Sequence, residues 1–490
     1  MIAKCQVPSF RARNDYFRPS LAQTTMLTLI AAALLAQPGP GIRQFIAVSD
    51  SIVALTNVRV IDGTGAPART GQTLVLKGGV IQAVGNVSQV TVPPGARTLD
   101  LDGRTVMPGY VMLHEHLFYP SGGGAIYNEQ GYSFPRLYLA GGVTTMRTGG
   151  NMAGYADINI KRAIDAGTML GPAIDVTAPY LEGPGLPIPQ VKALRGPDDA
   201  RKMVAYWADE GATSFKAYMN ISRAALGTAI DEAHTRGLKV TGHLCSITFR
   251  EAAALGIDDL EHGFVVASDF VPDKKPDECP TTPFAVQRSI ASLDVNGAPV
   301  RDLIAELVKR RVAITSTLTI FETFVRARPG ASAHALEAML PEARRQYEQS
   351  RAGIPPFIDS LFTVVLRKEM QLEKMFADAG GLLVVGTDPT GFGGVVAGYS
   401  NQRALELLVE AGFTPLEAIR IATLNGATYL GREARIGSIA VGKQADLVVV
   451  RGDPSTSIGD VKNVELVFKQ GVGYDSPKIF ASVKGRVGLH

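Results

Sequence analysis

The middle of the chain alternates short apolar segments with longer amphipathic ones, and this alternation constrains the fold more than any other feature. Helix-length segments such as "PDDARKMVAYWADEG" end at or near glycine, as helix C-termini often do. Repeated β and α units predict a parallel sheet, and eight of them predict a closed (β/α)8 TIM-like barrel over residues 107–431. The eight candidate strands are "TVMPGYVMLHEH", "GVTTMRT", "PAIDVTAP", "ATSFKAY", "LKVTGH", "IDDLEHG", "VAITSTL" and "LLVVGTD".

The two segments that flank this region have a different pattern. Residues 51–106 and 432–490 alternate β-branched residues with turns at Gly, Asp and Pro, which predicts short antiparallel strands. Neither segment is long enough to bury an apolar face alone, so we expect them to pair as one composite β-sandwich domain. The predicted class is therefore α/β. Within the barrel, residues 265–311 are read as a long loop and a helix over the mouth.

Residues 1–50 are interpreted as a leader. Basic residues precede the apolar run "MLTLIAAALLA" at 26–36, a pattern that resembles a signal peptide cleaved after Ala36. At eleven residues the run is too short to span a bilayer. We expect a periplasmic or secreted protein without a membrane span. The alternative is a cytoplasmic protein whose start codon is misassigned or whose first residues form a disordered extension.

Charge and cysteine content exclude some classes of function. The 49 Lys and Arg residues against 46 Asp and Glu leave a formal charge of only +3, without long basic runs, so we do not expect a nucleic-acid partner. The three cysteines, Cys5, Cys245 and Cys279, make neither a disulfide framework nor a C-x-x-C metal pattern. Sequence does not determine whether Cys245 and Cys279 pair.

Two of the seven histidines lie one residue apart in "GYVMLHEH". Side chains at i and i+2 of a strand point the same way, so His114 and His116 both face the barrel interior at the C-terminal end of the strand, where barrel active sites lie. Two imidazoles in that position can share one metal ion. Glu115 points away from them and is predicted to be structural.

Other strands end in further metal-ligand types: His243 in the fifth, His262 in the sixth and Asp388 in the eighth. In "TSFKAY" the fourth strand turns Lys216 inward. Burial and nearby positive charge lower the pKa of such a lysine, and a neutral amine can add carbon dioxide to give a carbamate that bridges two metals. The alternative is a lysine ion-paired to a barrel carboxylate.

Together these elements resemble the metal-dependent amidohydrolases with a binuclear centre, most closely the prolidase-like and imidazolonepropionase-like branch. The resemblance covers about residues 54–472. Beside the His-x-His pair and "FKAY", it rests on "GGVTTMRTGG", "TGH", "GIDDLEHG", "VVGTD", "ATLNGATYLG" and "IGSIAVGKQADLVVVRGDP".

The resemblance implies a hydrolase that cleaves a C–N amide bond, in a dipeptide, an N-acyl amino acid or a related small-molecule amide, by attack of a metal-bridging hydroxide. It implies two divalent metal ions; zinc suits the imidazole and carboxylate ligands, although manganese and cobalt also do. Asp388 would transfer the proton from the nucleophile to the leaving amine. Similar enzymes are commonly oligomers. The implied ligands are His114, His116 and Asp388 for the first metal, His243 and His262 for the second, and carboxylated Lys216 as the bridge.

Three positions depart from the family pattern. The family usually has aspartate at the positions of Met112 and Thr148 and often has histidine at the position of Cys245. None of these changes removes a ligand, but together they leave the usual substrate of the branch in question.

Two residues are candidates for substrate contacts. Tyr218 lies two residues beyond Lys216 on the same face, where its hydroxyl can reach a substrate carbonyl or simply pack. Arg147 can meet a substrate carboxylate, although a structural ion pair is the favoured reading. The loops "YLEGPGLPIPQ" and "GFGGVVAGYS" predict a pocket of small and apolar groups, hence a substrate with an apolar side.

Three other functions compete with amide hydrolysis. The same site can open a lactone or another ester, because the nucleophile attacks either carbonyl. A deaminase with one metal has no use for Lys216. A non-catalytic barrel scaffold is disfavoured because all six ligands are present. No role is assigned to the remaining histidines, His234, His334 and His490.

Overall fold

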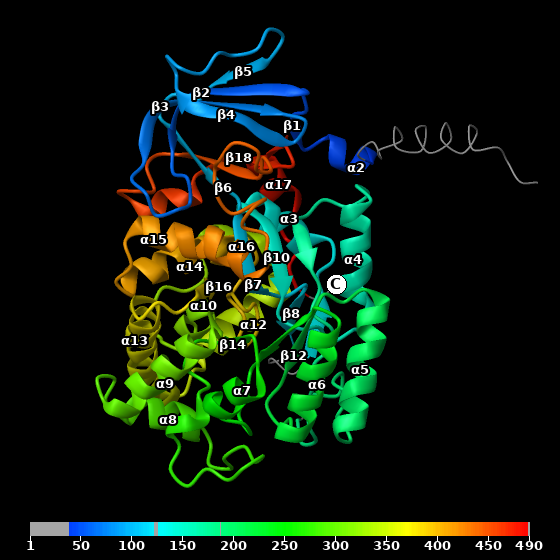
Figure 1. Ribbon diagram of the computed structural model, residues 1–490, viewed down its shortest axis with the longest axis vertical. Helices are drawn as coiled ribbons and strands as arrows, with labels where there is room; N and C mark the ends of the chain where they lie inside the picture. Colours follow the sequence, from blue (N-terminus) through cyan, green and yellow to red (C-terminus); the bar gives the residue numbers. More distant parts are fainter. Residues whose placement is uncertain (1–38, 122–125, 187, 489–490) are drawn as a thin grey trace, which may run out of the picture.

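The structure is a computed structural model, and it describes residues 39–121, 126–186 and 188–488. Ala36, the apolar run before it and His490 lie outside the described residues. Figure 1 shows a β-rich part formed by the two ends of the chain and a larger α/β part formed by its middle. Among the described helices, none has the length and apolar content needed to cross a membrane.

The strands of the α/β part are short and pair in parallel, as the alternating pattern predicts. One sheet has the order β11-β10-β7 and another the order β12-β13-β14-β15-β16, so an α/β fold is confirmed. Their bounds are β7 (Tyr110–Glu115), β10 (Val143–Thr148), β11 (Ala173–Asp175), β12 (Ser214–Ala217), β13 (Lys239–Gly242), β14 (Asp259–Glu261), β15 (Ala313–Ser316) and β16 (Leu383–Val385).

Backbone hydrogen bonds connect the two parallel sheets at both edges. Just beyond β11, the Ala178 amide donates to the Ser214 carbonyl of β12 over 3.0 Å. Just beyond β16, the amides of Thr387 and Asp388 donate to the His114 carbonyl of β7 over 3.0 and 3.1 Å. The C-terminal ends of the strands therefore meet at one edge.

Helices separate the parallel strands, and two of them end as the sequence predicts. α5 and α7 both stop at a left-handed glycine, Gly211 and Gly256, and α7 starts in a capping box between Thr248 and Glu251. The helices are α3 (Ser133–Ala140), α4 (Tyr155–Asp165), α5 (Pro197–Glu210), α6 (Arg223–Thr235), α7 (Phe249–Leu255), α8 (Ala285–Ser292), α9 (Ala298–Arg310), α10 (Leu318–Glu322), α11 (Ala333–Ala338), α12 (Pro341–Ala352), α13 (Pro356–Asp378), α14 (Tyr399–Glu410), α15 (Pro415–Arg420) and α16 (Gly426–Tyr429).

Three short elements complete the α/β part. They are a hairpin of β8 (Phe118–Ser121) and β9 (Ile126–Glu129), the 3-10 turn η2 (Ser268–Phe270) and the π-helix η3 (Ile421–Asn425). Residues 265–311, read from sequence as a long loop with one helix, contain η2, α8 and α9. The amphipathic segment at 285–292 is short and follows several prolines, so its helix was missed.

The two ends of the chain share one sheet of nine strands, in the order β1-β19-β18-β17-β6-β2-β3-β4 with β5 beside β2. The joint lies where β17 pairs antiparallel with β6, from Leu447 opposite Pro108 to Arg451 opposite Arg104. This is one hydrogen-bonded sheet, and a sandwich of two sheets stays a prediction. The elements are α2 (Pro40–Arg43), β1 (Ile46–Val48), β2 (Ile52–Val60), β3 (Arg69–Lys77), β4 (Val80–Asn86), β5 (Arg97–Asp100), β6 (Arg104–Pro108), β17 (Leu447–Arg451), η4 (Ile458–Lys462), β18 (Val464–Lys469), β19 (Val472–Asp475) and α17 (Ser476–Ser482).

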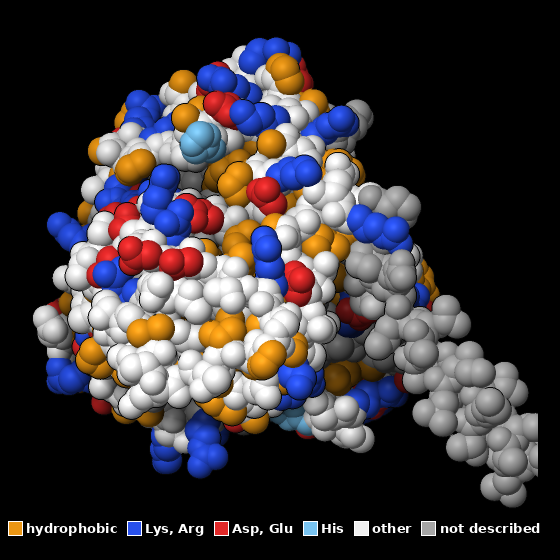
Figure 2. All heavy atoms as spheres, turned by 90° about the horizontal axis from the view of Figure 1, so that it is seen from above, with side chains coloured by type: hydrophobic (Ala, Val, Ile, Leu, Met, Phe, Trp, Pro, Cys, Tyr) orange, Lys and Arg blue, Asp and Glu red, His pale blue; other side chains and the backbone are white. Residues whose placement is uncertain are grey.

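An apolar core holds the shared sheet together, and both ends of the chain contribute to it. Val53, Leu55 and Leu74 from the N-terminal strands pack in one cluster with Val449 and Phe468 from the C-terminal strands. Figure 2 views the molecule from this end, where Lys and Arg side chains lie among Asp and Glu side chains.

Candidate functional site

The six predicted ligands come from five strands and meet at the C-terminal edge. His114 lies on β7 with His116 just beyond it, Lys216 is on β12, His243 and His262 directly follow β13 and β14, and Asp388 lies three residues past β16. We call His114, His116, Lys216, His243, His262 and Asp388 the six-residue cluster.

Short distances join the members of this cluster. Asp388 Oδ1 lies 3.2 Å from His116 Nε2 and 3.6 Å from His114 Nε2. Lys216 Nζ lies 3.2 Å from His114 Nε2. The ring centroid of His243 lies 4.5 Å from that of His262, whose Nδ1 is 3.7 Å from Asp388 Oδ2. The structure thus brings together side chains separated by up to 274 positions (114 to 388) of sequence.

Two cluster members occupy an unusual backbone conformation. His262 has φ +67° and Asp388 has φ +53°, in the left-handed region that side chains other than glycine rarely adopt. Hydrogen bonds from the Gly263 amide to the Thr315 carbonyl and from the Asp388 amide to the His114 carbonyl hold the two turns. Such outliers concentrate at functional sites, where the surrounding structure overdetermines them.

The hydrogen bonds of His116 leave a lone pair pointing into the cluster. Its Nδ1 lies 3.0 Å from the carbonyl oxygen of Gly150, which can only accept, so Nδ1 carries the proton. Burial lowers the pKa of His116 to about 4, so the ring is neutral and Nε2 is an acceptor. Nε2 nevertheless faces the Asp388 carboxylate, another acceptor, and two facing acceptors require a cation between or beside them.

Two of the other three histidines of the cluster, His114 and His262, give the same indication. Burial lowers the pKa of His114, but the Glu261 and Asp388 carboxylates outweigh burial and raise it, so the site attracts positive charge at Nε2. His262 Nδ1 lies 2.9 Å from the Thr317 hydroxyl, while its buried Nε2 has no hydrogen-bond partner. Ligand atoms of His114, His262 and Asp388 all lie within 4.8 Å of one another. These donors fit a divalent metal ion that accepts imidazole and carboxylate ligands.

Lys216 is almost fully buried beside these rings. Burial lowers the pKa of its ammonium group, and its Nζ lies 5.5 Å from the ring centroid of Tyr180 and 5.7 Å from that of Tyr218. Within the described ranges no salt bridge joins Lys216 to a carboxylate, although the Glu261 and Asp388 carboxylates partly offset the effect of burial on its pKa.

Glu261 is a site residue that the sequence reasoning missed. Its Oε2 lies 2.6 Å from His114 Nδ1, and its Oε1 accepts hydrogen bonds from Thr241 (2.6 Å) and from Arg147 (2.7 Å). Burial alone raises the pKa of Glu261, but His114 and Arg147 outweigh it and hold the pKa well below its usual value. The carboxylate therefore fixes which nitrogen of His114 faces the cluster. The signal was available, because Asp259 and Glu261 alternate along β14 as inward-facing residues do.

The two candidate substrate contacts lie in different surroundings. Arg147 is completely buried and pairs with Asp259 (2.8 Å) and Glu261, so it lies in the ion pair that was the favoured reading from sequence. Tyr218 is half-buried, and its ring centroid lies 4.9 Å from that of His243. Glu115, predicted to be structural, accepts hydrogen bonds from Asn401 (2.8 Å) and from the Thr387 hydroxyl.

A disulfide lies next to the cluster. Cys245, two residues after His243, is bonded to Cys279, with the two Cα atoms 5.0 Å apart. The bond ties the segment between η2 and α8 to the end of β13. Sequence left this pairing open because it depends on a Cα separation that only the fold provides.

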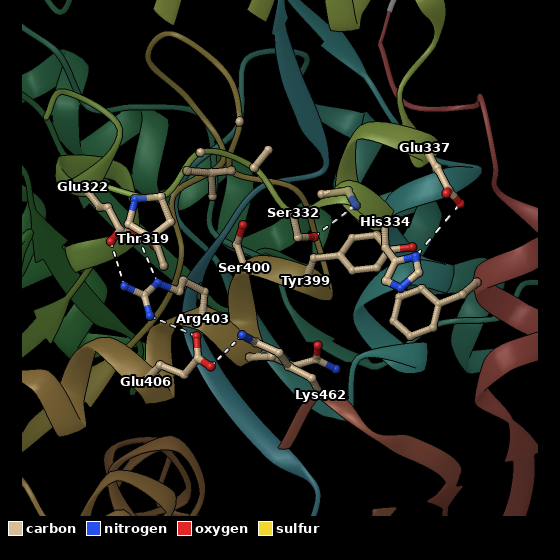
Figure 3. A pocket seen from close by; sticks show the side chains of 18 of the residues that line it. Thr319, Glu322, Ser332, His334, Glu337, Tyr399, Ser400, Arg403, Glu406 and Lys462 are labelled. Carbon is tan, nitrogen blue, oxygen red and sulfur yellow. Dashed lines mark hydrogen bonds and ion pairs between the residues drawn. The ribbon is translucent and has the colours of Figure 1, made fainter. Parts of the chain in front are cut away.

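A large cavity lies apart from the cluster. It has a volume of 830 Å³ and is bounded by α10, α11, α14 and α17; Figure 3 shows Glu322, Arg403, Glu406 and Lys462 on its wall. We call it the flank cavity. Its charged groups pair with one another, Arg403 with Glu322 (2.8 Å) and Lys462 with Glu406 (2.6 Å). None of the six cluster residues lines it.

Comparison with known proteins agrees with this geometry. Residues 105–473 match the model of the amidohydrolase family. Among solved structures, the chain is similar to a "putative prolidase from Bifidobacterium longum", with a TM-score of 0.66 and 25% identity over 88% of this chain and 99% of that chain.

Curated proteins match over short stretches only. Adenine deaminase 3 of Rhizobium meliloti (strain 1021) is 36% identical over 88 residues, 18% of this chain and 14% of that protein. N-substituted formamide deformylase of Arthrobacter pascens is 36% identical over 70 residues, 14% of this chain and 12% of that protein. The aligned stretches thus span well under a quarter of the length of these two relatives. The family match over most of the chain and the full-length structural likeness are decisive, and the chain belongs to the amidohydrolase family and is a hydrolase.

Proposed function

We propose that this hydrolase cleaves the C–N bond of an amide in a dipeptide, an N-acyl amino acid or a related small molecule. The observation on which the proposal rests is the facing of His116 Nε2 and Asp388 Oδ1, two acceptors 3.2 Å apart in a buried cluster. Two of the three printed names agree with it, since one is a putative prolidase and another a deformylase of N-substituted formamides, which are amides.

The six-residue cluster would hold two divalent ions, zinc by its donor set. His114, His116 and Asp388 would hold one ion and His243 and His262 the other, and carboxylated Lys216 would contribute ligand oxygens to the site. When bound, such ions activate water and polarise the scissile carbonyl. His114 is oriented for this role by Glu261, through the 2.6 Å contact at Nδ1.

Lys216 would be carboxylated before it binds metal. Its neutral Nζ forms a bond to the carbon of carbon dioxide and releases a proton to solvent, which leaves a carbamate with two ligand oxygens. Burial supports this step because it lowers the lysine pKa, and the neighbouring His114 Nε2 at 3.2 Å disfavours a second cation.

Asp388 would transfer the proton. Burial raises the pKa of this carboxyl, but His114 and the other imidazoles outweigh it and hold the pKa well below its usual value, so the group is ionised. Oδ1 accepts a hydrogen bond from the Thr390 hydroxyl over 3.0 Å and faces two imidazoles. Oδ2 is therefore the atom that takes the proton of the attacking water and returns it to the leaving nitrogen.

We also propose the architecture that places this site. The edge hydrogen bonds at Ser214 and His114 support closure of the eight parallel strands into one barrel over residues 107–431, beside a composite β domain of residues 51–106 and 432–490. The disulfide between Cys245 and Cys279 supports export to an oxidising compartment, as does the leader pattern. Assembly into a homo-oligomer is part of the same proposal.

A substrate screen with metal analysis tests this function. N-acyl amino acids, Xaa-Pro dipeptides and lactones would be offered to protein whose metal content is measured. We expect amide turnover in protein that contains two divalent ions per chain. Turnover of lactones alone would replace the amide assignment by an esterase assignment, and one tightly bound ion per active chain would favour a deaminase.

A further inference from the structure

Two groups of aromatic side chains lie against the histidines of the cluster. We define the first aromatic wall as Phe118, Tyr127, Tyr180 and Tyr218. We define the second aromatic wall as Phe321, Phe324, Phe362 and Phe392.

The first aromatic wall touches two of the predicted ligands. Phe118 stacks on His116 with ring centroids 4.3 Å apart, and Tyr127 meets Phe118 edge to face at 5.0 Å. Tyr218 lies 4.9 Å from His243 and 4.5 Å from Tyr180, again between centroids. Phe118 and Tyr180 are buried, whereas Tyr127 and Tyr218 are half-buried and expose part of each ring.

The second aromatic wall lies against a third predicted ligand, His262. The ring centroid of Phe321 lies 6.0 Å from that of His262. Phe324 packs on Phe362 at 4.6 Å and on Phe392 at 5.1 Å, and both Phe324 and Phe392 are half-buried. This wall thus resembles the first one in combining buried rings, Phe321 and Phe362, with half-buried ones.

The strand order separates Tyr180 and Tyr218 of the first wall from the second wall, whereas Phe118 and Tyr127 lie on the hairpin that follows β7. Tyr180 and Tyr218 follow β11 and β12, while Phe321 and Phe392 follow β15 and β16, four strands further along. Both walls lie beyond the C-terminal ends of their strands, on the same side as the ligands. Within the described part of the chain, the only cation over a ring of either wall is Lys216, a cluster member itself. Among the described residues, no arginine lies over a ring of either wall.

We propose that the substrate is an amide with an aromatic or bulky apolar group on each side of the scissile C–N bond. The acyl substituent rests on one wall and the amine substituent on the other, and each gains the burial and ring contacts that an aromatic surface provides. This inference rests on the proposed amide hydrolysis, because it assigns the two halves of the same substrate.

Four amides with one scissile bond in common test the proposal: N-acetylglycine, N-benzoylglycine, N-acetylphenylalanine and N-benzoylphenylalanine. We expect each aromatic group to raise kcat/KM by about tenfold and the two effects to multiply, since each group occupies its own wall. If all four substrates are cleaved with equal kcat/KM, the walls do not bind the aromatic groups, while the proposed amide hydrolysis still holds.

Variants assign each substituent to a wall. Tyr127→Ala should remove the advantage of one aromatic group, and Phe324→Ala that of the other, because each half-buried ring belongs to a different wall. Phe357→Ala is the matched control, since this phenylalanine is 53% exposed and belongs to neither wall, and it should keep the full selectivity. Loss of kcat/KM by the same factor for all four substrates in both wall variants would show a structural role and contradict the proposal.

A binding measurement separates this inference from the hydrolysis itself. N-benzylphenylalanine has a methylene in place of the carbonyl, so it presents both aromatic groups and is not cleaved. Calorimetry with metal-loaded protein should show that it binds at least tenfold more tightly than N-ethylglycine, and that Tyr127→Ala and Phe324→Ala each reduce the difference. Tight binding of N-benzylphenylalanine without turnover of any amide would refute the proposed hydrolysis but support aromatic binding at the walls. Equal affinity for the two compounds would refute aromatic binding at the walls.

Discussion

The six-residue cluster and the flank cavity are two polar regions of the same α/β part, and they differ in how their charges are satisfied. In the flank cavity, Arg403 pairs with Glu322 and Lys462 with Glu406, so each charge has a partner within the protein (Figure 3). In the cluster, the neutral His116 Nε2 faces the Asp388 carboxylate, and His262 Nε2 has no partner. The cavity has the volume expected of a ligand site, whereas the cluster has buried acceptors without a partner, which are typical of functional sites.

We therefore place the proposed chemistry at the cluster, where buried polar atoms lack partners, and not in the flank cavity. One contact links the two regions, since Thr319 on the cavity wall donates to the Thr387 carbonyl beside Asp388 over 2.7 Å. If the comparison is right, substitutions in the cluster should abolish activity, and substitutions in the cavity should change stability alone.

The largest effect is expected from Lys216→Ala. Removal of the buried amine removes the proposed bridge, so the variant should lose bound metal together with a factor on the order of 10⁴ in kcat/KM. Metal content per chain and amide turnover would be measured on the same sample. A variant that keeps two metals and full activity would show that Lys216 does not bridge them.

Asp388→Asn should have the next largest effect. The amide keeps the shape of the side chain but cannot accept a proton at Oδ2, so we expect kcat to fall by about 10² to 10⁴-fold with the fold retained. Stopped or steady-state kinetics together with circular dichroism would measure both. An unimpaired rate in a folded variant would remove Asp388 from proton transfer.

The residues of the cluster, Glu261 and the flank cavity differ in how far the sequence alone predicts them. The alternation of side chains along a strand predicts that His114, His116 and Lys216 face inward, and the motifs identify His243, His262 and Asp388. The same alternation could have identified Glu261 but could not pair it with His114, because their separation of 147 positions is closed only by the parallel register. The flank cavity was unpredictable, since it joins residues from Thr319 to Lys484.

Glu261→Gln tests whether the cluster depends on its hydrogen-bonded support. The amide can still meet His114 Nδ1, but it no longer supplies the charge that stabilises the imidazole as a ligand, so metal affinity should fall by about 10 to 100-fold. Competition with a chelator would measure the affinity. Glu322→Gln in the flank cavity is the matched control and should leave metal affinity unchanged; equal losses in both variants would erase the distinction between the regions.

Arg403→Met tests the other half of the comparison. Arg403 pairs with Glu322 (2.8 Å) and Glu410 (2.7 Å), and its loss leaves the buried Glu322 with Arg328 as its remaining partner. We expect the free energy of unfolding to fall by about 2 kcal/mol, while kcat/KM stays within about twofold of the parent value. Calorimetry and kinetics would be compared, and a tenfold loss of activity at unchanged stability would show that the cavity belongs to the catalytic machinery.

A third buried polar group needs a proton instead of a metal. Glu369 and Glu373 lie one turn apart on α13, and Glu369 Oε1 accepts a hydrogen bond from the Phe264 amide over 2.8 Å, two residues from His262. Burial raises the pKa of both carboxyls, that of Glu373 to about 8. Between pH 4.5, the ordinary value for glutamate, and about 8, the folded protein therefore keeps a proton that the unfolded chain has released.

The sign of the resulting pH dependence follows from proton counting. Because the folded state binds more protons in this window, this contribution to stability is complete below the unfolded pKa, decreases by about 1.4 kcal/mol per pH unit as the pH rises from about 4.5, and is lost once the pH passes about 8. Glu373→Gln has no such proton to lose, so its melting temperature should vary less between pH 5 and pH 8. Glu337→Gln, on an exposed side chain of α11, should keep the parental slope. An identical slope in Glu373→Gln would mean that the pair is ionised in the folded protein, and this buried group would then resemble the cluster in needing a cation.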